Sequence, residues 1–96
     1  MVVVWSDGAK AALRKASLYI ALDSLQNAQM IRDELIDLTI DLSDNPEKYP
    51  PDKFKTDNDG TWHAFEKHHY RISYRVLKGQ IRIVRMRHTS QSPLTY

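Results

Sequence analysis

"YRISYRVLKGQIRIVRMRH", Tyr70–His88, is the stretch that decides the fold. Apolar and polar residues alternate on both sides of Lys78-Gly79, which is the pattern of two half-buried strands joined by a tight turn. If this dipeptide is a two-residue loop, opposite residues have numbers that sum to 157, so Val76 faces Ile81. The sequence therefore predicts an antiparallel hairpin with one face in the core.

This register assigns every side chain of the hairpin to one of two faces. On the core face it pairs Tyr74 with Ile83 and Ile72 with Arg85. On the solvent-facing side it places Arg71, Ser73, Arg75, Arg82, Val84, Met86 and His88. His88 would lie opposite His69, with Arg71 as its diagonal neighbour at roughly 7–8 Å between backbones. We therefore expect an arginine and a histidine to meet on the open face of the sheet.

Two helices are predicted before the hairpin. A β-branched run, Val2–Trp5, indicates a first strand, and Ser6 or Asp7 would cap the helix that follows. Asn45-Pro46 ends a second helix, because the residue before proline disfavours helical backbone. Apolar residues of this second helix recur at steps of three and four: Ala28, Ile31, Leu35, Leu38 and Leu42.

The segment between the helices and the hairpin supplies a further strand. Strand-like sequence begins at Phe54, and Asp57–Gly60 makes a turn. The order is thus strand, helix, helix and then three or more antiparallel strands. We expect one α+β domain over residues 1–96, with two layers, in which a helical hairpin covers one face of a mainly antiparallel, twisted sheet.

Composition limits the class of protein. A chain of 96 residues, 42% hydrophobic and 27% charged, is typical of one globular domain. No apolar run approaches the roughly 20 residues that span a bilayer, and the start lacks the basic region of a signal peptide. There is no cysteine, which fits the cytoplasm. We expect a cytoplasmic protein without a membrane partner.

Charge is divided unequally along the chain. Residues 1–52 hold 5 Lys and Arg against 9 Asp and Glu, whereas residues 53–96 hold 9 against 3. The second part is a candidate surface for an anionic partner. A small sheet also needs polar residues on its exposed face, and charge alone does not decide between these two explanations.

An arginine beside a histidine suits the cleavage of RNA by its own 2′-hydroxyl. That reaction needs a proton acceptor, a proton donor and cations that stabilise the charged phosphorane. His88 could act in either proton role, and Arg71 offers a fork that matches phosphate oxygens. No metal and no cofactor is required. The remaining cations near this face would bind the substrate: Lys53, Lys55, Arg75 and Arg82.

Each of these residues also has a structural explanation. A histidine at a strand end is more often a surface residue than a catalyst. Arg71 could simply pair with Glu66. No ligand partner falls at a recognised metal-binding spacing from three other histidines, His63, His68 and His69.

The chain also resembles a known family. The order β-α-α-β-β-β, the Asn-Pro stop after the second helix and the closing segment are similar to the RelE/ParE superfamily of toxins from bacterial type II toxin–antitoxin modules. The resemblance runs over nearly the whole chain. It is most specific in Tyr70-Arg71-Ile72-x-Tyr74 and in the Ile-x-Ile strand that ends in His88. It implies a toxin that inhibits growth and a cognate antitoxin that binds it in a hetero-oligomer.

The resemblance implies two different activities. RelE-like members, among them the YoeB and YafQ groups, enter the ribosomal A site and cut messenger RNA, whereas ParE-like members poison DNA gyrase. Arg71 matches the arginine that stabilises the scissile phosphate in RNA-cleaving members. His88 matches the strand-end histidine that acts as general acid in the YoeB group. Lys53 and Lys55 fall where basic residues precede the second strand.

The match to the RNA-cleaving members is incomplete. Asp52 lies near the position of the general-base glutamate of the YoeB group, and Glu66 is an alternative. Eight residues follow His88, and Tyr96 either folds back over the site or ends a mobile tail, which we favour. The favoured function is ribosome-dependent, metal-independent cleavage of messenger RNA. The alternatives are a gyrase poison without catalytic activity and a degenerate member kept as a regulatory partner.

Overall fold

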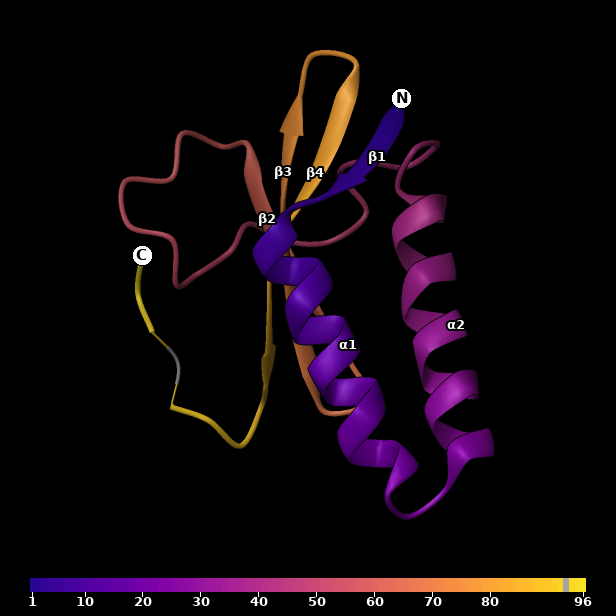
Figure 1. Cartoon of the computed structure of the whole chain (residues 1–96). Helices are drawn as coiled ribbons and strands as arrows, with labels where there is room; N and C mark the ends of the chain where they lie inside the picture. Colours follow the sequence, from indigo (N-terminus) through magenta and orange to yellow (C-terminus); the bar gives the residue numbers. More distant parts are fainter. Residues whose placement is uncertain (93) are drawn as a thin grey trace.

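The structure, a computed structural model, describes residues 1–92 and 94–96 and has two layers (Figure 1). A four-stranded sheet carries a hairpin of two helices on one face, and the segments around residues 50–61 and 94–96 lie on the other side. The predicted two-layer α+β fold is confirmed. In chain order the elements are β1 Val2–Trp5, α1 Asp7–Ala21, α2 Leu25–Asp41, β2 Trp62–Lys67, β3 Tyr70–Leu77 and β4 Gln80–His88.

Serine residues cap both helices. Ser6 Oγ accepts a hydrogen bond from Ala9 N–H (3.1 Å), and Ser24 Oγ accepts one from Asn27 N–H (3.1 Å), so each satisfies a free donor of the first helical turn.

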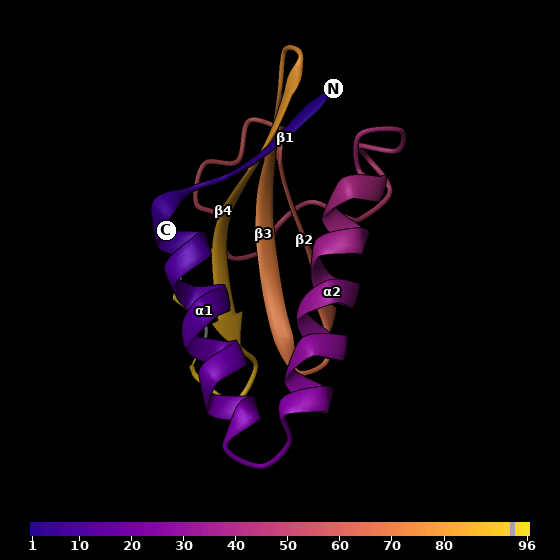
Figure 2. The ribbon, with the colours of Figure 1, turned by 45° about the vertical axis from the view of Figure 1, so that its right-hand side comes forward.

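Figure 2 shows the two helices side by side in front of the sheet. Among the described residues, no helix is long and apolar enough to cross a membrane. The fully buried side chains between the layers include Leu35, Leu42, Ile72, Tyr74, Ile81 and Ile83.

The sheet has the strand order β1-β4-β3-β2. β1 runs parallel to β4, with Val3 opposite Ile81, and the other neighbours are antiparallel. The predicted two-residue loop is confirmed, because Leu77 pairs with Gln80 and Gly79 has a φ of 72°. A left-handed glycine at this position is what a tight hairpin turn requires. The hairpin therefore starts in the register that the sequence predicts.

The register changes halfway along β4. The pairs next to the turn, as far as Tyr74 opposite Ile83, are those predicted. A β-bulge then inserts one extra residue, Val84, so that Ser73 lies opposite Arg85. Two predicted pairs are therefore wrong: instead of Ile72–Arg85 and His69–His88, the structure pairs Ile72 with Met86 and Tyr70 with His88.

The prediction that strand structure begins at Phe54 is also wrong. Residues 42–61 form a loop, and β2 begins only at Trp62. Pro50 and Pro51 have no N–H to donate to a ladder, and only an isolated bridge joins Pro51 to His63. The loop thus runs past the edge of β2 and crosses to the open face of the sheet.

Candidate functional site

Arg71 and His88 lie on opposite faces of the sheet. Arg71 is on the open face, whereas His88 lies opposite the buried Tyr70, on the face that the helices cover. The predicted meeting of the two is therefore wrong. The physical reason is the bulge, because one extra residue turns every later side chain of β4 to the other face. The same shift moves Arg85 to the open face and Met86 into the core.

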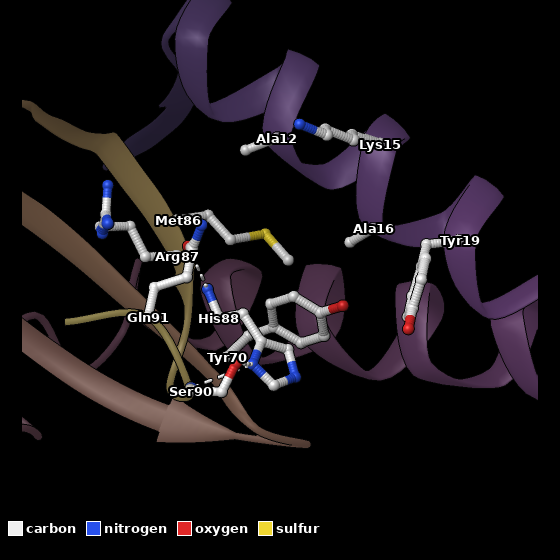
Figure 3. A pocket seen from close by; sticks show the side chains of 10 residues that line it. All are labelled: Ala12, Lys15, Ala16, Tyr19, Tyr70, Met86, Arg87, His88, Ser90 and Gln91. Atoms are coloured by element: carbon white, nitrogen blue, oxygen red, sulfur yellow. Dashed lines mark hydrogen bonds between the residues drawn. The ribbon is translucent and has the colours of Figure 1, made fainter.

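His88 lines a cavity of about 450 Å³ between α1 and the end of β4 (Figure 3). Its Nδ1 accepts a hydrogen bond from Ser90 N–H (3.0 Å), so the neutral ring carries its proton on Nε2. The ring meets Tyr70 edge-on with centroids 5.1 Å apart, and its centroid lies 6.2 Å from that of His69. These neighbours hold the imidazole on the helix side, where Arg71 cannot share a substrate with it.

Two carboxylates hold Arg71 on the open face. Its Nη2 donates to Asp52 Oδ1 (2.8 Å) and its Nη1 donates to Glu66 Oε2 (3.0 Å). The guanidinium also lies over the ring of Phe54, 4.7 Å from the centroid. The pair with Glu66 that the sequence offered as a structural explanation is present, and Asp52 is a second, buried partner.

Asp52 is a buried carboxylate under the open face, with an exposed fraction of 2%. It accepts hydrogen bonds from Arg71, from the Tyr96 hydroxyl (2.5 Å) and from Phe54 N–H (3.0 Å). Burial alone would raise the pKa of Asp52, but the bonds from Tyr96, Arg71, Phe54 and the Ser73 side chain together hold that pKa below its ordinary value. An ionised carboxylate with its lone pairs occupied is a structural centre and a poor general base.

Tyr96 folds back over the open face, so the expected mobile tail is wrong. Its N–H donates to Phe54 O (3.0 Å), and its main-chain oxygen accepts from Thr56 N–H (2.7 Å) and Lys55 Nζ (3.2 Å). Burial, together with the hydrogen bond to Asp52, raises the pKa of Tyr96 to about 12. The phenol is therefore protonated at neutral pH and serves as a donor to the carboxylate.

Cations and aromatic rings share the open side. Arg75 lies 5.1 Å and Lys55 5.0 Å from the centroid of Trp62, and Arg85 lies 4.4 Å from that of Tyr96. All four cations that the sequence assigned to substrate binding are on this side: Lys53, Lys55, Arg75 and Arg82. The register shift adds two more, Arg85 and Arg87. The surface can bind an anionic or acidic partner, but none of the histidines, all of which are described, lies on it in a position to transfer a proton.

Sequence reasoning misses the roles of Asp52 and Tyr96. Asp52 follows two prolines and caps the Phe54 N–H, which is a weak signal, and the sequence offers it only as a candidate base. For Tyr96 there is no signal beyond an aromatic residue in a polar tail. The bulge does leave a trace in the sequence, since apolar Met86 comes three residues after Ile83 where a regular strand would have a step of two.

The remaining histidines are engaged in separate places. His63 Nδ1 donates to Tyr49 O (2.9 Å), and its ring stacks on that of Tyr74. His68 contacts the carboxylate of Glu34. Within residues 1–92 and 94–96, no three His, Asp or Glu side chains come together in a group that could hold a metal ion.

Comparisons with known proteins agree with this fold. The family model of the ParE toxin of the type II toxin–antitoxin system, parDE, matches residues 3–93. A solved structure of the chromosomal ParDE TA system from P. aeruginosa is similar, with a TM-score of 0.70 and 16% identity over 92% of this chain and 95% of that chain. At this identity the likeness shows the shared fold alone. No curated protein sequence gives a significant match.

Proposed function

The chain belongs to the family of ParE toxins of type II toxin–antitoxin systems, and we propose that it inhibits growth by binding DNA gyrase and poisoning it. In this proposal no residue of the chain takes part in covalent chemistry. The open face of the sheet, with its cations and aromatic rings, is the surface that binds the enzyme. A cognate antitoxin, which membership of the family implies, keeps the toxin silent in a hetero-oligomer.

The observation that carries the proposal is the separation of Arg71 from His88. Cleavage of RNA needs the phosphate-binding arginine and the proton donor within reach of one phosphate. The sheet lies between the two side chains, and Arg71 already donates to two carboxylates. Asp52, the candidate base, accepts three hydrogen bonds, from Phe54 N–H, Arg71 and the Tyr96 hydroxyl. The cleavage of messenger RNA at the ribosome is therefore the less supported function.

The chemistry of the open face supports a protein partner. Arginine, tryptophan and tyrosine are enriched at the centres of protein interfaces, where flat side chains stack at a small cost in conformational entropy. Arg75 over Trp62 is such a pair. Electrostatic complementarity requires an acidic surface on the partner and makes association faster at low salt.

Expression of single variants in bacteria tests the proposal. Arg82 is exposed on the open face, so Arg82→Glu reverses a charge there without disturbing the core. His88→Ala changes only the helix side. We expect His88→Ala to inhibit growth as the wild type does and to induce the SOS response, and Arg82→Glu to inhibit growth less.

Mapping of message ends in the same cells separates the two activities. The gyrase proposal predicts no new cuts inside translated codons. New cuts within codons that disappear in a folded His88→Ala protein would show that the chain is a nuclease and that the proposal is wrong. Circular dichroism of each purified variant provides the check on folding.

A further inference from the structure

The last described residues cover part of the open face as a strap, which we define as residues 94–96. The strap is attached to the open face mainly through Tyr96. Tyr96 makes main-chain hydrogen bonds to Phe54 and Thr56, and its hydroxyl reaches the buried Asp52. Its ring meets Trp62 edge-on with centroids 5.6 Å apart. Tyr96 thus occupies a defined position on the open face, which we call its seat.

The rest of the strap adds little to this hold. Leu94 has an exposed fraction of 52%, and Thr95 is exposed as well. Before Tyr96, the strap accepts a hydrogen bond at Leu94 O from Arg85 Nη1 (3.2 Å). A segment fixed at one residue and otherwise exposed opens as a unit when that residue leaves its seat.

The strap also occupies cations of the open face. Arg85 lies over the ring of Tyr96 and donates to Leu94 O, and Lys55 Nζ donates to Tyr96 O (3.2 Å). Arg71 shares the Asp52 carboxylate with the Tyr96 hydroxyl. Departure of Tyr96 from its seat would free hydrogen-bonding groups on Arg85 and Lys55 and remove the edge-on contact of its ring with Trp62.

We infer that the strap is an autoinhibitory contact: Tyr96 competes with the toxin's partner for the cationic open face, and the partner binds the open form. The inference rests on the proposed function, because it takes the open face to be the surface that binds gyrase. It adds that this surface is only partly available in the free protein. Release of the strap is then a step of target binding.

The population of the open form sets the size of the effect. A minor conformation of this kind has a population of roughly 0.1–10%. The apparent dissociation constant is the intrinsic constant divided by the open fraction. Permanent release of the strap is therefore expected to tighten partner binding by about tenfold or more.

Amide hydrogen exchange of the free protein measures directly how readily the strap opens. Tyr96→Ala removes the ring and the hydroxyl, Tyr96→Phe removes the hydroxyl alone, and Thr95→Ala is the matched control at an exposed position. Thr56 N–H is bonded to Tyr96 O, and Val76 N–H in β3 is bonded to Thr61 O (2.8 Å), the residue just before β2. In Tyr96→Ala we expect exchange at Thr56 to speed up at least about tenfold while exchange at Val76 stays the same.

Binding to purified DNA gyrase, with immobilised heparin as a second, polyanionic probe, then tests the competition. The inference predicts gyrase affinity that rises about tenfold in Tyr96→Ala, rises less in Tyr96→Phe and stays unchanged in Thr95→Ala. Equal or weaker gyrase binding by Tyr96→Ala would overturn it. If no form binds gyrase, the proposed function is wrong, and the heparin column still tests the strap. Elution of Tyr96→Ala at higher salt than the wild type would support the claim that the strap covers cations of the open face, and elution at the same salt would refute that claim.

Discussion

Replacement of Asp52 by asparagine removes the charge under the open face while it keeps the shape of the side chain. Asparagine offers one carbonyl oxygen, and its NH₂ group would face either Arg71 Nη2, which can only donate, or the Tyr96 hydroxyl, which donates to Asp52 in the wild type. Either the bond from Arg71 is therefore lost, or the bond with Tyr96 reverses its direction and no longer involves a charged acceptor. Asp52→Asn should destabilise the fold and loosen the attachment of Tyr96.

The structure gives the magnitude of this effect. Hydrogen bonds to charged groups contribute about 1.5–3 kcal/mol each, and removal of one partner of a buried ion pair costs about 3–5 kcal/mol. Arg71 keeps its bond to Glu66 and its side chain is 18% exposed, which favours the lower end, about 3 kcal/mol. With an m value of about 1–1.5 kcal/mol/M, the urea midpoint falls by about 2–3 M.

The pH dependence provides a second test of the same residue. The pKa of Asp52 is lowered in the folded protein from its ordinary value of 3.8, so its contribution to stability is present above that value and is lost as the pH falls through the folded pKa. The difference in unfolding free energy between wild type and Asp52→Asn is then full at pH 7 and shrinks below about pH 4.

Urea unfolding followed by circular dichroism at pH 7 and pH 3 measures both effects. Asp44→Asn, at an exposed acidic position, is the control and should unfold as the wild type does. The reasoning is refuted if Asp52→Asn lies within about 0.5 kcal/mol of wild type at pH 7, or if the difference between them does not change with pH.

Three further changes test other parts of the structure. Tyr74→Phe removes a buried hydroxyl that donates to Pro46 O (2.9 Å), and it should cost about 1 kcal/mol in urea unfolding. His69→Gly relieves a φ of 67° in the turn between β2 and β3 and should stabilise the fold by about 0.5–1 kcal/mol, seen as a rise in Tm of roughly 4 °C. The pKa of Tyr96 is raised from 10 to about 12, so the contribution of its hydroxyl to folding stability is present below pH 10 and is lost as the pH rises toward 12. The difference in unfolding free energy between wild type and Tyr96→Phe should therefore shrink between pH 10 and pH 12. A constant difference would contradict the position described for Tyr96.

The layers and the start of the hairpin could be predicted because they depend on local patterns. The spacing of Ala28, Ile31 and Leu35 defines one side of a helix, and Gly79 supplies the left-handed residue of the turn. Both features act over a few residues. Both are found where the sequence places them.

The site could not be predicted because it depends on one inserted residue and on contacts between distant segments. The register of a hairpin follows from its turn only until a bulge interrupts it. The bulge at Val84 interrupts it before Arg85 and His88, the residues on which the predicted site depends. Asp52 and Tyr96 are 44 residues apart, and no periodic pattern links them. The sequence therefore predicts that Arg71 meets His88, whereas in the structure Arg71 pairs with the buried carboxylate of Asp52.

The most direct test of the central claim is a cleavage assay with purified DNA gyrase and supercoiled plasmid. The wild-type chain is expected to trap gyrase on DNA, so that linear plasmid accumulates after denaturation of the enzyme, and His88→Ala is expected to do the same. Absence of gyrase-dependent linear DNA, together with codon-internal cuts in messenger RNA on purified ribosomes, would contradict the account.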